Sequence, residues 1–371
     1  MRWKQYLKII SEVCEVIAGQ SPESKFYNKE GEGLPFYQGK KLFSDRFIGE
    51  PTTWTTKITK EALPNDILMS VRAPVGPINI SNQRICIGRG LAAIRASEKV
   101  DNDYLFYFLL KHETEIVGNI GAVFNSINKK QIGNIQIPIP PLAEQKQIVT
   151  LLDAAFAKID QAKANIEKNI ANAKELFQSK LNAIFSQKGD GWEERTLGEV
   201  CENLDRKRVP ITKSKRVEGE IPYYGASGIV DYVADYLFDE DLLLVSEDGA
   251  NLLARTYPIA FSISGKTWVN NHAHVLKFEN MESQKFIEYY LNSIKLDDYV
   301  SGMAQPKLNQ KKLNSIKVPF PEIAKQQEIN QLINGLSMQK SNIITVFQKK
   351  LQNLEELKKS LLQKAFAGEL T

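Results

Sequence analysis

Two long stretches of the chain carry apolar residues at the spacing of a coiled coil. Their seam positions advance by alternating steps of four and three residues, which keeps them on one face of a helix. The pattern predicts one helix from about 142 to 185 and a second within 323–371. The predicted seams comprise Ile148, Leu152, Ala155, Ile159, Ala162, Ile166, Asn169, Ala173 and Leu176 in the first helix, and Ile329, Ile333, Leu336, Lys340, Ile343, Phe347, Lys350, Leu354, Leu357 and Leu361 in the second.

The two helical stretches are copies of one another. Residues 128–186 align with residues 309–367 at a constant offset of 181 without a gap, so that Gln145 falls on Gln326. A period of about half the chain indicates two related modules, because the repeats of a solenoid are only about 20 to 50 residues long. The polar seam residues are interpreted as a loose, hydrated layer, with register selection as the alternative.

Short apolar runs broken by Gly and Pro fill the block that precedes each helix. Such runs predict strands and turns, whereas 103–115 has helical spacing. The phrase Glu-Val-Cys-Glu occurs at 12–15 and again at 199–202, and the apolar run at 66–71 resembles that at 241–246. We therefore predict an α+β protein in which two related α/β domains are separated by a long antiparallel two-helix coiled coil, with pseudo-two-fold symmetry.

The chain path predicts how these parts are arranged. The first helix leaves one block and enters the other, and at 1.5 Å per residue its roughly 40 residues span about 60 Å. If the second helix packs on the first, it runs in the opposite direction and returns the chain to the first block. Two related blocks with different surfaces suit the recognition of two different patches on duplex DNA, because rigid dimeric readers use such geometry to set half-site spacing.

Composition narrows the function classes only slightly. The 371 residues contain 43% hydrophobic and 25% charged residues, which is ordinary for a globular protein. The net charge of +4 permits nucleic-acid binding without requiring it. No apolar run approaches the roughly 18 residues of a membrane span, so we expect a cytoplasmic location. Cys14, Cys86 and Cys201 form no CxxC pair, and no metal site is expected.

The sequence offers little support for catalysis. An amino-methyltransferase needs an Asn/Asp-Pro-Pro-aromatic loop, and none is found. Gly265-Lys-Thr has the end of a phosphate-binding loop, but the leading glycine of that motif would fall at Ala260. We predict no catalytic residue and no cofactor in this chain. A non-enzymatic, two-headed protein-binding adaptor with a coiled-coil spacer stays open as the alternative to DNA recognition.

Taken in order, several phrases resemble the specificity subunit of type I restriction-modification enzymes. The resemblance covers essentially the whole chain. It implies target-recognition domains at 1–141 and 188–322, and helical coiled-coil spacers at 142–187 and 323–371. The phrases are Pro-Pro-Leu-Ala-Glu-Gln-Lys-Gln-Ile at 140–148, Ile-Pro-Tyr-Tyr-Gly-Ala-Ser-Gly at 221–228, Ser-Glu-Asp-Gly-Ala-Asn at 246–251, Gly-Lys-Thr-Trp-Val-Asn-Asn-His-Ala-His-Val-Leu at 265–276 and Leu-Leu-Gln-Lys-Ala-Phe-Ala-Gly-Glu-Leu at 361–370.

The resemblance implies a non-catalytic subunit that works with partners. Each recognition domain of this family reads one half of a bipartite target in double-stranded DNA. The helices dock two modification subunits that methylate adenine with S-adenosylmethionine, and motor/restriction subunits that use ATP and Mg join them, so these cofactors are expected in partner subunits. The residues assigned to the partner and helix seam are Ile148, Leu152, Ile159, Ile166, Ile329, Ile333, Leu336, Ile343, Phe347, Leu354 and Leu357.

Candidate DNA contacts are donors and aromatic residues on glycine-rich loops, because loops on a rigid scaffold usually carry recognition. Asn and Arg can bind adenine and guanine edges, and carboxylates can accept from cytosine. Trp268 as a core residue, Asn271 as a turn cap and Asp248 as part of a hairpin turn stay open as alternatives. The candidates are Tyr37, Gln38, Lys40, Lys41, Arg72, Arg84, Arg89 and Asn125 in the first domain, and Tyr223, Tyr224, Ser227, Glu247, Asp248, Asn251, Arg255, Lys266, Trp268, Asn270, Asn271, His272, Gln305 and Lys307 in the second.

Overall fold

A computed structural model describes residues 3–118, 126–186, 191–302 and 305–370 of the chain. It consists of two compact units: the first contains Met1–Ile166 and Lys349–Thr371, and the second contains Glu167–Gln348. Each of the two long helices, α4 (Leu142–Ser186) and α9 (Ile323–Ala367), therefore contributes one part to each unit. Within the described residues, no helix combines the length and the apolar character that a membrane span requires.

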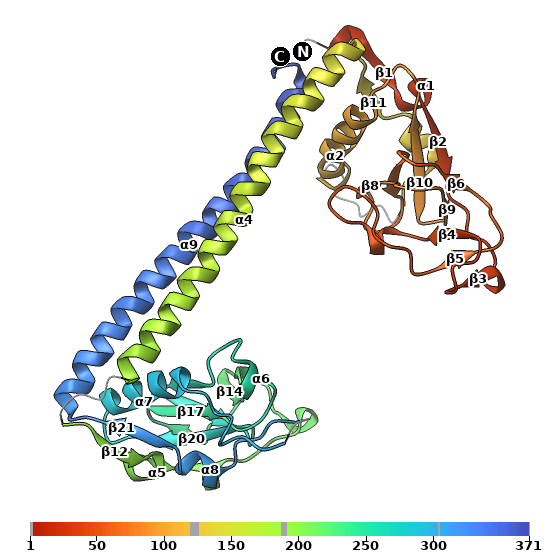
Figure 1. Ribbon diagram of the computed structural model, residues 1–371. Coiled ribbons are helices and arrows are strands. Elements are labelled where there is room, and N and C mark those ends of the chain that lie inside the picture. Colours follow the sequence, from red (N-terminus) through yellow and green to blue (C-terminus); the bar gives the residue numbers. More distant parts are fainter. Residues whose placement is uncertain (1–2, 119–125, 187–190, 303–304, 371) are drawn as a thin grey trace. The chain divides into compact units, whose positions relative to one another are not determined.

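The first unit combines short strands with two short helices and one longer helix (Figure 1). The longer helix, α2 (Asn102–Gly118), confirms the helix predicted at 103–115. The elements are η1 (Lys4–Tyr6), β1 (Leu7–Ile9), α1 (Ile10–Val13), β2 (Cys14–Ala18), η2 (Ser24–Phe26), β3 (Tyr27–Asn28), β4 (Leu34–Tyr37), η3 (Lys40–Leu42), β5 (Trp54–Thr55), β6 (Glu61–Ala62), β7 (Ile67–Ser70), β8 (Ile78–Ile80), β9 (Ile85–Ile87), β10 (Leu91–Ala96), α2 (Asn102–Gly118), α3 (Lys129–Gly133) and β11 (Gln136–Pro138).

The second unit follows a similar order of elements, with fewer strands before its central strand β17. A short helix, α6, follows β17 and has no counterpart after β7. The elements are β12 (Glu193–Thr196), α5 (Leu197–Val200), β13 (Glu202–Asn203), η4 (Asp205–Lys207), η5 (Lys213–Lys215), β14 (Ile221–Gly225), β15 (Gly228–Val233), β16 (Phe238–Asp239), β17 (Leu242–Ser246), α6 (Asn251–Ala254), β18 (Ala260–Ile263), β19 (Lys266–Val269), β20 (Ala273–Lys277), α7 (Met281–Ser293), α8 (Gln310–Asn314) and β21 (Lys317–Phe320).

The central sheet has the same strand order in both units. It is β2-β10-β7-β8 in the first unit and β13-β20-β17-β18 in the second. The other sheet has five strands in the first unit, β3-β5-β4-β9-β6, and four in the second, β15-β14-β19-β16. A second sheet contains one parallel pair in each unit, β4 with β9 and β14 with β19. The predicted fold class, two related α/β domains, is therefore confirmed, and the duplication extends into blocks whose sequences differ strongly.

The central strand of each unit is buried on both faces, which explains its continuous apolar sequence. In β17, Leu243 and Val245 pack with Phe286 of helix α7, whereas Leu242 and Leu244 pack with Val269 of the second sheet. In β7, Ile67 and Met69 likewise join a core with α2, and Leu68 joins the other core. This alternation follows from the two-residue period of a strand. The helix and the second sheet thus cover opposite faces of the same strand.

The two long helices pack antiparallel within each unit. In the first unit, Ile148, Leu152 and Ile159 of α4 share a core with Leu362 and Phe366 near the end of α9. In the second unit, the order is reversed, because Leu181 and Phe185 at the end of α4 pack with Ile329 and Ile333 at the start of α9. The antiparallel pairing predicted from the chain path is confirmed within each unit.

The predicted seam is wrong in its middle part. Leu176, Ile343 and Leu357 are exposed by 60%, 43% and 46%, and Asn169 and Lys350 are exposed as well. Ile170, Phe177, Ile344, Leu351 and Lys358 are less exposed and take their places. The reason is that an α-helix has 3.6 residues per turn, so a strict heptad of 3.5 drifts off the buried face. Lys340 stays half-buried, with its ammonium 3.9 Å from the centre of the Phe177 ring.

The repeated glutamines Gln145 and Gln326 attach each long helix to its unit. Gln145 is fully buried; its amide donates to the Pro140 carbonyl (2.7 Å) and the Lys99 carbonyl (3.0 Å), and its oxygen accepts from the Asp101 N–H (2.8 Å). Gln326 donates to the Pro321 carbonyl (2.7 Å) and accepts from the Ser283 hydroxyl (2.8 Å). Each glutamine thereby satisfies polar groups at both the start of the long helix and the start of α2 or α7.

Candidate nucleic-acid interface

Four loops of the second unit meet at one end of its sheets, and we call them the loop edge: 225–228, 247–251, 270–272 and 305–308. Antiparallel pairing places Ser246, at the end of β17, opposite Ala273, at the start of β20. The parallel strands β14 and β19 end beside each other at the same place. Hydrogen bonds join the loops: the Ser246 hydroxyl donates to the Ala226 carbonyl (2.5 Å), and the Leu308 N–H donates to the Glu247 carbonyl (2.8 Å).

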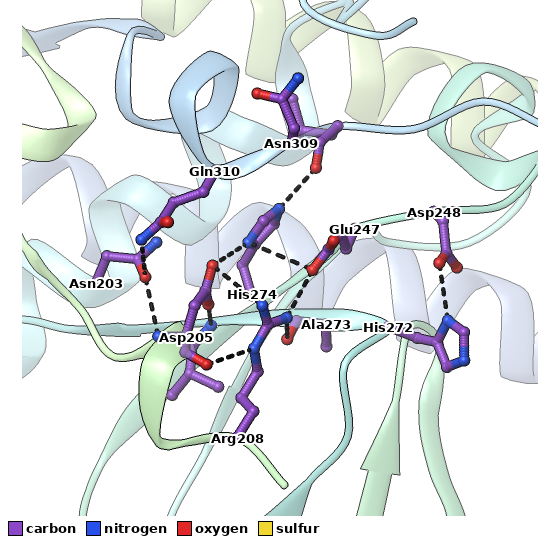
Figure 2. A network of polar contacts seen from close by, with 12 residues as sticks. Asn203, Asp205, Arg208, Glu247, Asp248, His272, Ala273, His274, Asn309 and Gln310 are labelled. Carbon is purple, nitrogen blue, oxygen red and sulfur yellow. Dashed lines mark hydrogen bonds and ion pairs between the residues drawn. The ribbon is translucent and has the colours of Figure 1, made fainter. Parts of the chain in front are cut away.

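A buried histidine, His274, fixes the base of the loop edge (Figure 2). Its Nδ1 lies 2.6 Å from Oδ2 of Asp205, and its Nε2 lies 2.7 Å from the Leu308 carbonyl oxygen. Both ring nitrogens thus lie within hydrogen-bond distance of an oxygen atom, and the histidine ties β20 to the loop at 305–308.

Arg208 adds a buried cation to the same network. Its Nη1 donates to Oε2 of Glu247 (2.7 Å) and to the Ala273 carbonyl (2.7 Å), and its Nη2 lies 3.4 Å from Oδ2 of Asp205. The guanidinium thus contacts both carboxylates of the network. Burial raises the pKa of the Asp205 carboxyl, but hydrogen bonds from His274 and the Val275 N–H, together with the positive charges of His274 and Arg208, outweigh burial and hold that pKa below its usual 3.8.

The group Asp205, Glu247 and His274 has the composition of a metal site but not its chemistry. One candidate ligand atom from each residue lies within 4.8 Å of the others. A metal needs a ring nitrogen with a free lone pair, whereas both nitrogens of His274 are already engaged in hydrogen bonds within the protein. The Arg208 guanidinium already pairs with both carboxylates. The network is therefore a scaffold that orients the loops.

Above this network lies an exposed polar rim that consists of Asn271, His272, Gln305 and Lys307. The ring of His272 is 52% exposed, and its Nδ1 lies 2.8 Å from Oδ2 of Asp248. Lys307 lies 3.3 Å from Oε1 of Glu247 and is 54% exposed. The side chain of Asn270 points inward and accepts from the His272 N–H (2.8 Å). The rim thus presents amide, imidazole and ammonium groups, which can contact both base edges and phosphates.

Several residues predicted to contact DNA are instead buried and structural. The Tyr37 hydroxyl donates to the Gly49 carbonyl (2.8 Å), and the Tyr223 hydroxyl accepts from the Ile211 N–H (3.0 Å). The Asn251 side-chain oxygen accepts from the N–H and hydroxyl of Thr256, both at 2.9 Å, and so shapes its own loop. Burial of these three side chains argues against direct contact with DNA.

Arg255 closes the end of helix α7 rather than facing outward. Its guanidinium donates to the carbonyls of Leu291 (3.2 Å) and Ile294 (2.7 Å), which lack partners within the helix. Burial lowers the pKa of this guanidinium, and the Asp297 carboxylate opposes that shift. Arg255 itself has a φ of 52°, in the left-handed region.

We expect Arg255→Ala to destabilise the second unit by about 1 to 3 kcal/mol, because two helix-terminal carbonyls lose a charged donor. Thermal denaturation of the full chain measures this change. Lys295→Ala, which removes an exposed cation close to the same helix end, should stay within about 0.5 kcal/mol. Equal effects of the two substitutions would contradict the capping role.

Other predicted residues of the second unit lie at least partly exposed, on or beside the strands that lead to the loop edge. Trp268 donates from Nε1 to the Val209 carbonyl (2.7 Å), and Lys266 lies 4.8 Å from the centre of the Tyr236 ring. The Ser227 hydroxyl donates to the Tyr257 hydroxyl (3.0 Å). Tyr224 is half-buried beside Phe261, and burial raises the pKa of its phenol. These residues stay candidates for contacts at the margin of the interface.

The first unit has a loop edge at the equivalent position. Ser70, at the end of β7, pairs with Leu91, at the start of β10, and the Val71 N–H donates to the Gly90 carbonyl (3.0 Å). Gln38, Lys40, Lys41, Arg72 and Arg89 are exposed at or close to this edge. Arg84 directly precedes β9 and forms two hydrogen bonds with Glu61, at 2.7 and 3.0 Å. Asn125 lies outside the described residues.

Sequence reasoning missed the residues that hold the loop edge together. Asp205, Arg208 and His274 were not selected, because nothing in the sequence shows that they meet. One available signal was overlooked: residues 206–216, Arg-Lys-Arg-Val-Pro-Ile-Thr-Lys-Ser-Lys-Arg, contain six basic residues and no acidic residue.

Comparison with known proteins decides the family. Residues 4–172 and 189–356 each match the family described as "Type I restriction modification DNA specificity domain". The chain belongs to this family. Each match spans the strands of one unit and most of the long helix that follows, so the specificity-domain family accounts for both copies of the repeat.

Members and structural neighbours of the family cover the whole chain. A putative type I restriction enzyme MjaX specificity subunit from Methanocaldococcus jannaschii is 49% identical over 160 residues, which are 42% of this chain and only 37% of that protein's length. The MjaIX specificity subunit from the same organism is 24% identical over 98% of this chain and 93% of its own length. A structure from a study of complex assembly and conformational transition of the type I R-M system has a TM-score of 0.76 and 18% identity over 98% of both chains, and it shows the same fold.

Proposed function

We propose that the chain is the DNA sequence-specificity subunit of a type I restriction-modification enzyme and has no catalytic activity of its own. In this proposal, each unit reads one half of a bipartite site in double-stranded DNA. The observation that carries it is the pair of loop edges, which occupy the same position in the central sheet but present different side chains. Relatives named as type I specificity subunits support the proposal, and the adaptor alternative is not favoured by them.

The different chemistry of the two loop edges supports two different half-sites. At the end of the central strand, the first unit has Arg72, whereas the second unit has Glu247 and Asp248. A guanidinium donates to guanine, whereas carboxylates accept from cytosine. In the second unit, Arg208 pairs with Glu247 at 2.7 Å, and Nδ1 of His272 lies 2.8 Å from Oδ2 of Asp248.

The long helices are proposed to dock two modification subunits, which would bring S-adenosylmethionine, together with motor/restriction subunits that use ATP and Mg. Support comes from apolar side chains that lie outside the helix seam. Leu151, Leu176, Leu332, Met338 and Val346 are exposed on α4 and α9. Exposed apolar side chains on a helical surface are typical of protein interfaces. A cytoplasmic location stays a prediction.

An exchange of recognition domains tests the proposal. Residues 1–141 are replaced by the equivalent part of a relative with a different target, and the chain is expressed with modification subunits. We expect methylation-sensitive sequencing of the host genome to show that one half of the methylated site changes while the other half stays the same. The reciprocal exchange of 188–322 should change the other half. A change in both halves after either exchange would contradict one unit for each half-site.

A further inference from the structure

The segment between β13 and β14 differs in charge from its counterpart in the first unit. Residues 204–220 contain six basic and three acidic residues, and all six basic residues lie within 206–216. The counterpart between β2 and β4, residues 19–33, contains two basic and three acidic residues. The two units therefore have the same strand order in the central sheet, but only the second has a strongly cationic connection here. We call residues 206–216 the strap.

The strap is fixed to the unit at several points along its length. Arg208 bonds Glu247 and the Ala273 carbonyl, and the Val209 carbonyl accepts from Trp268 (2.7 Å). The Ile211 N–H donates to the Tyr223 hydroxyl (3.0 Å). Arg216 donates to Oδ2 of Asp231 (2.8 Å) and lies 4.3 Å from the centre of the Tyr223 ring. The chain is thus held in place before any ligand binds, which lowers the entropic cost of binding.

One of these attachments places the strap beside the loop edge. Figure 2 shows Arg208 next to Glu247 and Ala273, and the chain continues from Ala273 directly to His272 of the exposed rim. The two inward-facing arginines, Arg208 and Arg216, therefore position the strap, while its other cations are left for the solvent. The start of the strap therefore lies beside the rim.

The four remaining cations of the strap face the solvent. Arg206, Lys207, Lys213 and Lys215 are exposed, and within the described residues no carboxylate lies within ion-pair distance of them. The exposed hydroxyl residues Thr212 and Ser214 alternate with the two lysines. By contrast, Lys25 of the counterpart segment pairs with Glu23 at 2.7 Å. Lysine, arginine, serine and threonine side chains are the usual ligands of DNA phosphates.

We propose that the strap binds the sugar–phosphate backbone of duplex DNA, so that the second unit supplies more of the sequence-independent affinity than the first. This inference rests on the proposed function and deepens it, because it separates the group that holds DNA from the rim that reads it. A row of unpaired cations beside the rim provides charge neutralisation without base selectivity. The first unit lacks such a row in its counterpart segment, so its binding to DNA depends more on its loop edge.

The test measures the salt dependence of DNA binding by the full chain. Fluorescence anisotropy with a labelled 30-base-pair duplex of arbitrary sequence gives the slope of log K against log salt concentration. The strap variant carries Arg206→Gln, Lys207→Gln, Lys213→Gln and Lys215→Gln. Each lost phosphate contact reduces the slope by about 0.9, so we expect the slope to become shallower by roughly 2 to 4. Preference among DNA sequences should stay unchanged.

A matched control removes the same number of charges from the first unit. Lys25→Gln, Lys29→Gln, Lys57→Gln and Lys60→Gln also replace four exposed cations, and we expect the slope to change by less than about 1. Thermal denaturation verifies that both variants fold. Equal slopes for the strap variant and the wild type, with DNA binding intact, would overturn the proposal that the strap binds the DNA backbone. The proposed function would be unaffected. A change in sequence preference would also overturn it, since the strap would then read bases. Absence of salt-dependent binding by the wild type would overturn both proposals.

Discussion

Replacement of Asp205 by alanine is expected to lower the free energy of unfolding of the second unit by about 3 to 5 kcal/mol, the usual cost of removing one partner from a buried ion pair. The carboxylate accepts from His274 (2.6 Å) and from the Val275 N–H (2.9 Å), and its side chain is 5% exposed. Without it, the buried Arg208 guanidinium keeps only Glu247 as a counter-charge, and Nδ1 of His274 loses its partner. The expected loss is large because a buried charge loses its partner.

Scanning calorimetry of the full chain measures this effect. The two units differ in sequence, and the transition of the second unit should move to lower temperature while that of the first stays in place. Asp239→Ala is the matched control, because Asp239 is exposed on β16 and should change stability by less than about 0.5 kcal/mol. A loss of less than about 1 kcal/mol for Asp205→Ala would contradict the structural role of the network.

Asp205 also predicts an acid dependence of stability. Its folded-state pKa is lower than the usual value of 3.8, so the unfolded chain binds the proton more tightly than the folded chain. The contribution of Asp205 to stability is therefore complete above about pH 3.8 and is lost as the pH falls through the lower, folded-state pKa. Asp205→Asn should flatten this acid limb, which unfolding measurements between neutral and acidic pH would show.

Gln326→Ala is expected to cost about 2 to 4 kcal/mol, because it leaves the Pro321 carbonyl and the Ser283 hydroxyl without their partner and opens a cavity. Gln326 is 1% exposed, whereas its neighbour Gln327 is exposed. Gln327→Ala is therefore the control and should be nearly neutral. Hydrogen exchange should show faster opening at the start of α9 in Gln326→Ala alone.

The same comparison can be made independently in the first unit. Gln145→Ala, with exposed Gln147→Ala as its control, should give a similar loss at the start of α4. Equal effects at Gln145 and Gln147 would show that the buried glutamine does not attach the helix to the unit.

The sequence predicted those features that depend on neighbouring residues. The phrase at 12–15 and its copy at 199–202 correctly indicated equivalent positions, the turn from α1 into β2 and that from α5 into β13. The apolar run at 241–246 predicted the buried strand β17. The repeated seam of the two long helices, together with the chain path, predicted their antiparallel pairing. The middle of the helix seam was wrong, because a strict heptad does not follow the 3.6-residue turn.

The side chains at the loop edge were harder to predict because their partners lie far away in the sequence. The Tyr223 hydroxyl is satisfied by the distant Ile211 N–H, and the Arg255 guanidinium caps α7 by donating to the Leu291 carbonyl. Nothing in the local sequence distinguishes these residues from exposed donors. His274 and Asp205 are 69 positions apart, and only the folded sheet brings them together. Contact of the exposed candidates with DNA stays a prediction.

The separation between the buried His274 network and the exposed rim has an evolutionary consequence. Asn271, His272, Gln305 and Lys307 can be replaced without removing a partner from His274 or Arg208. Mutations at these rim positions therefore change the stability of the second unit little and can accumulate one at a time. Under the proposed function, a population can thus explore new target sequences while its protein stays folded.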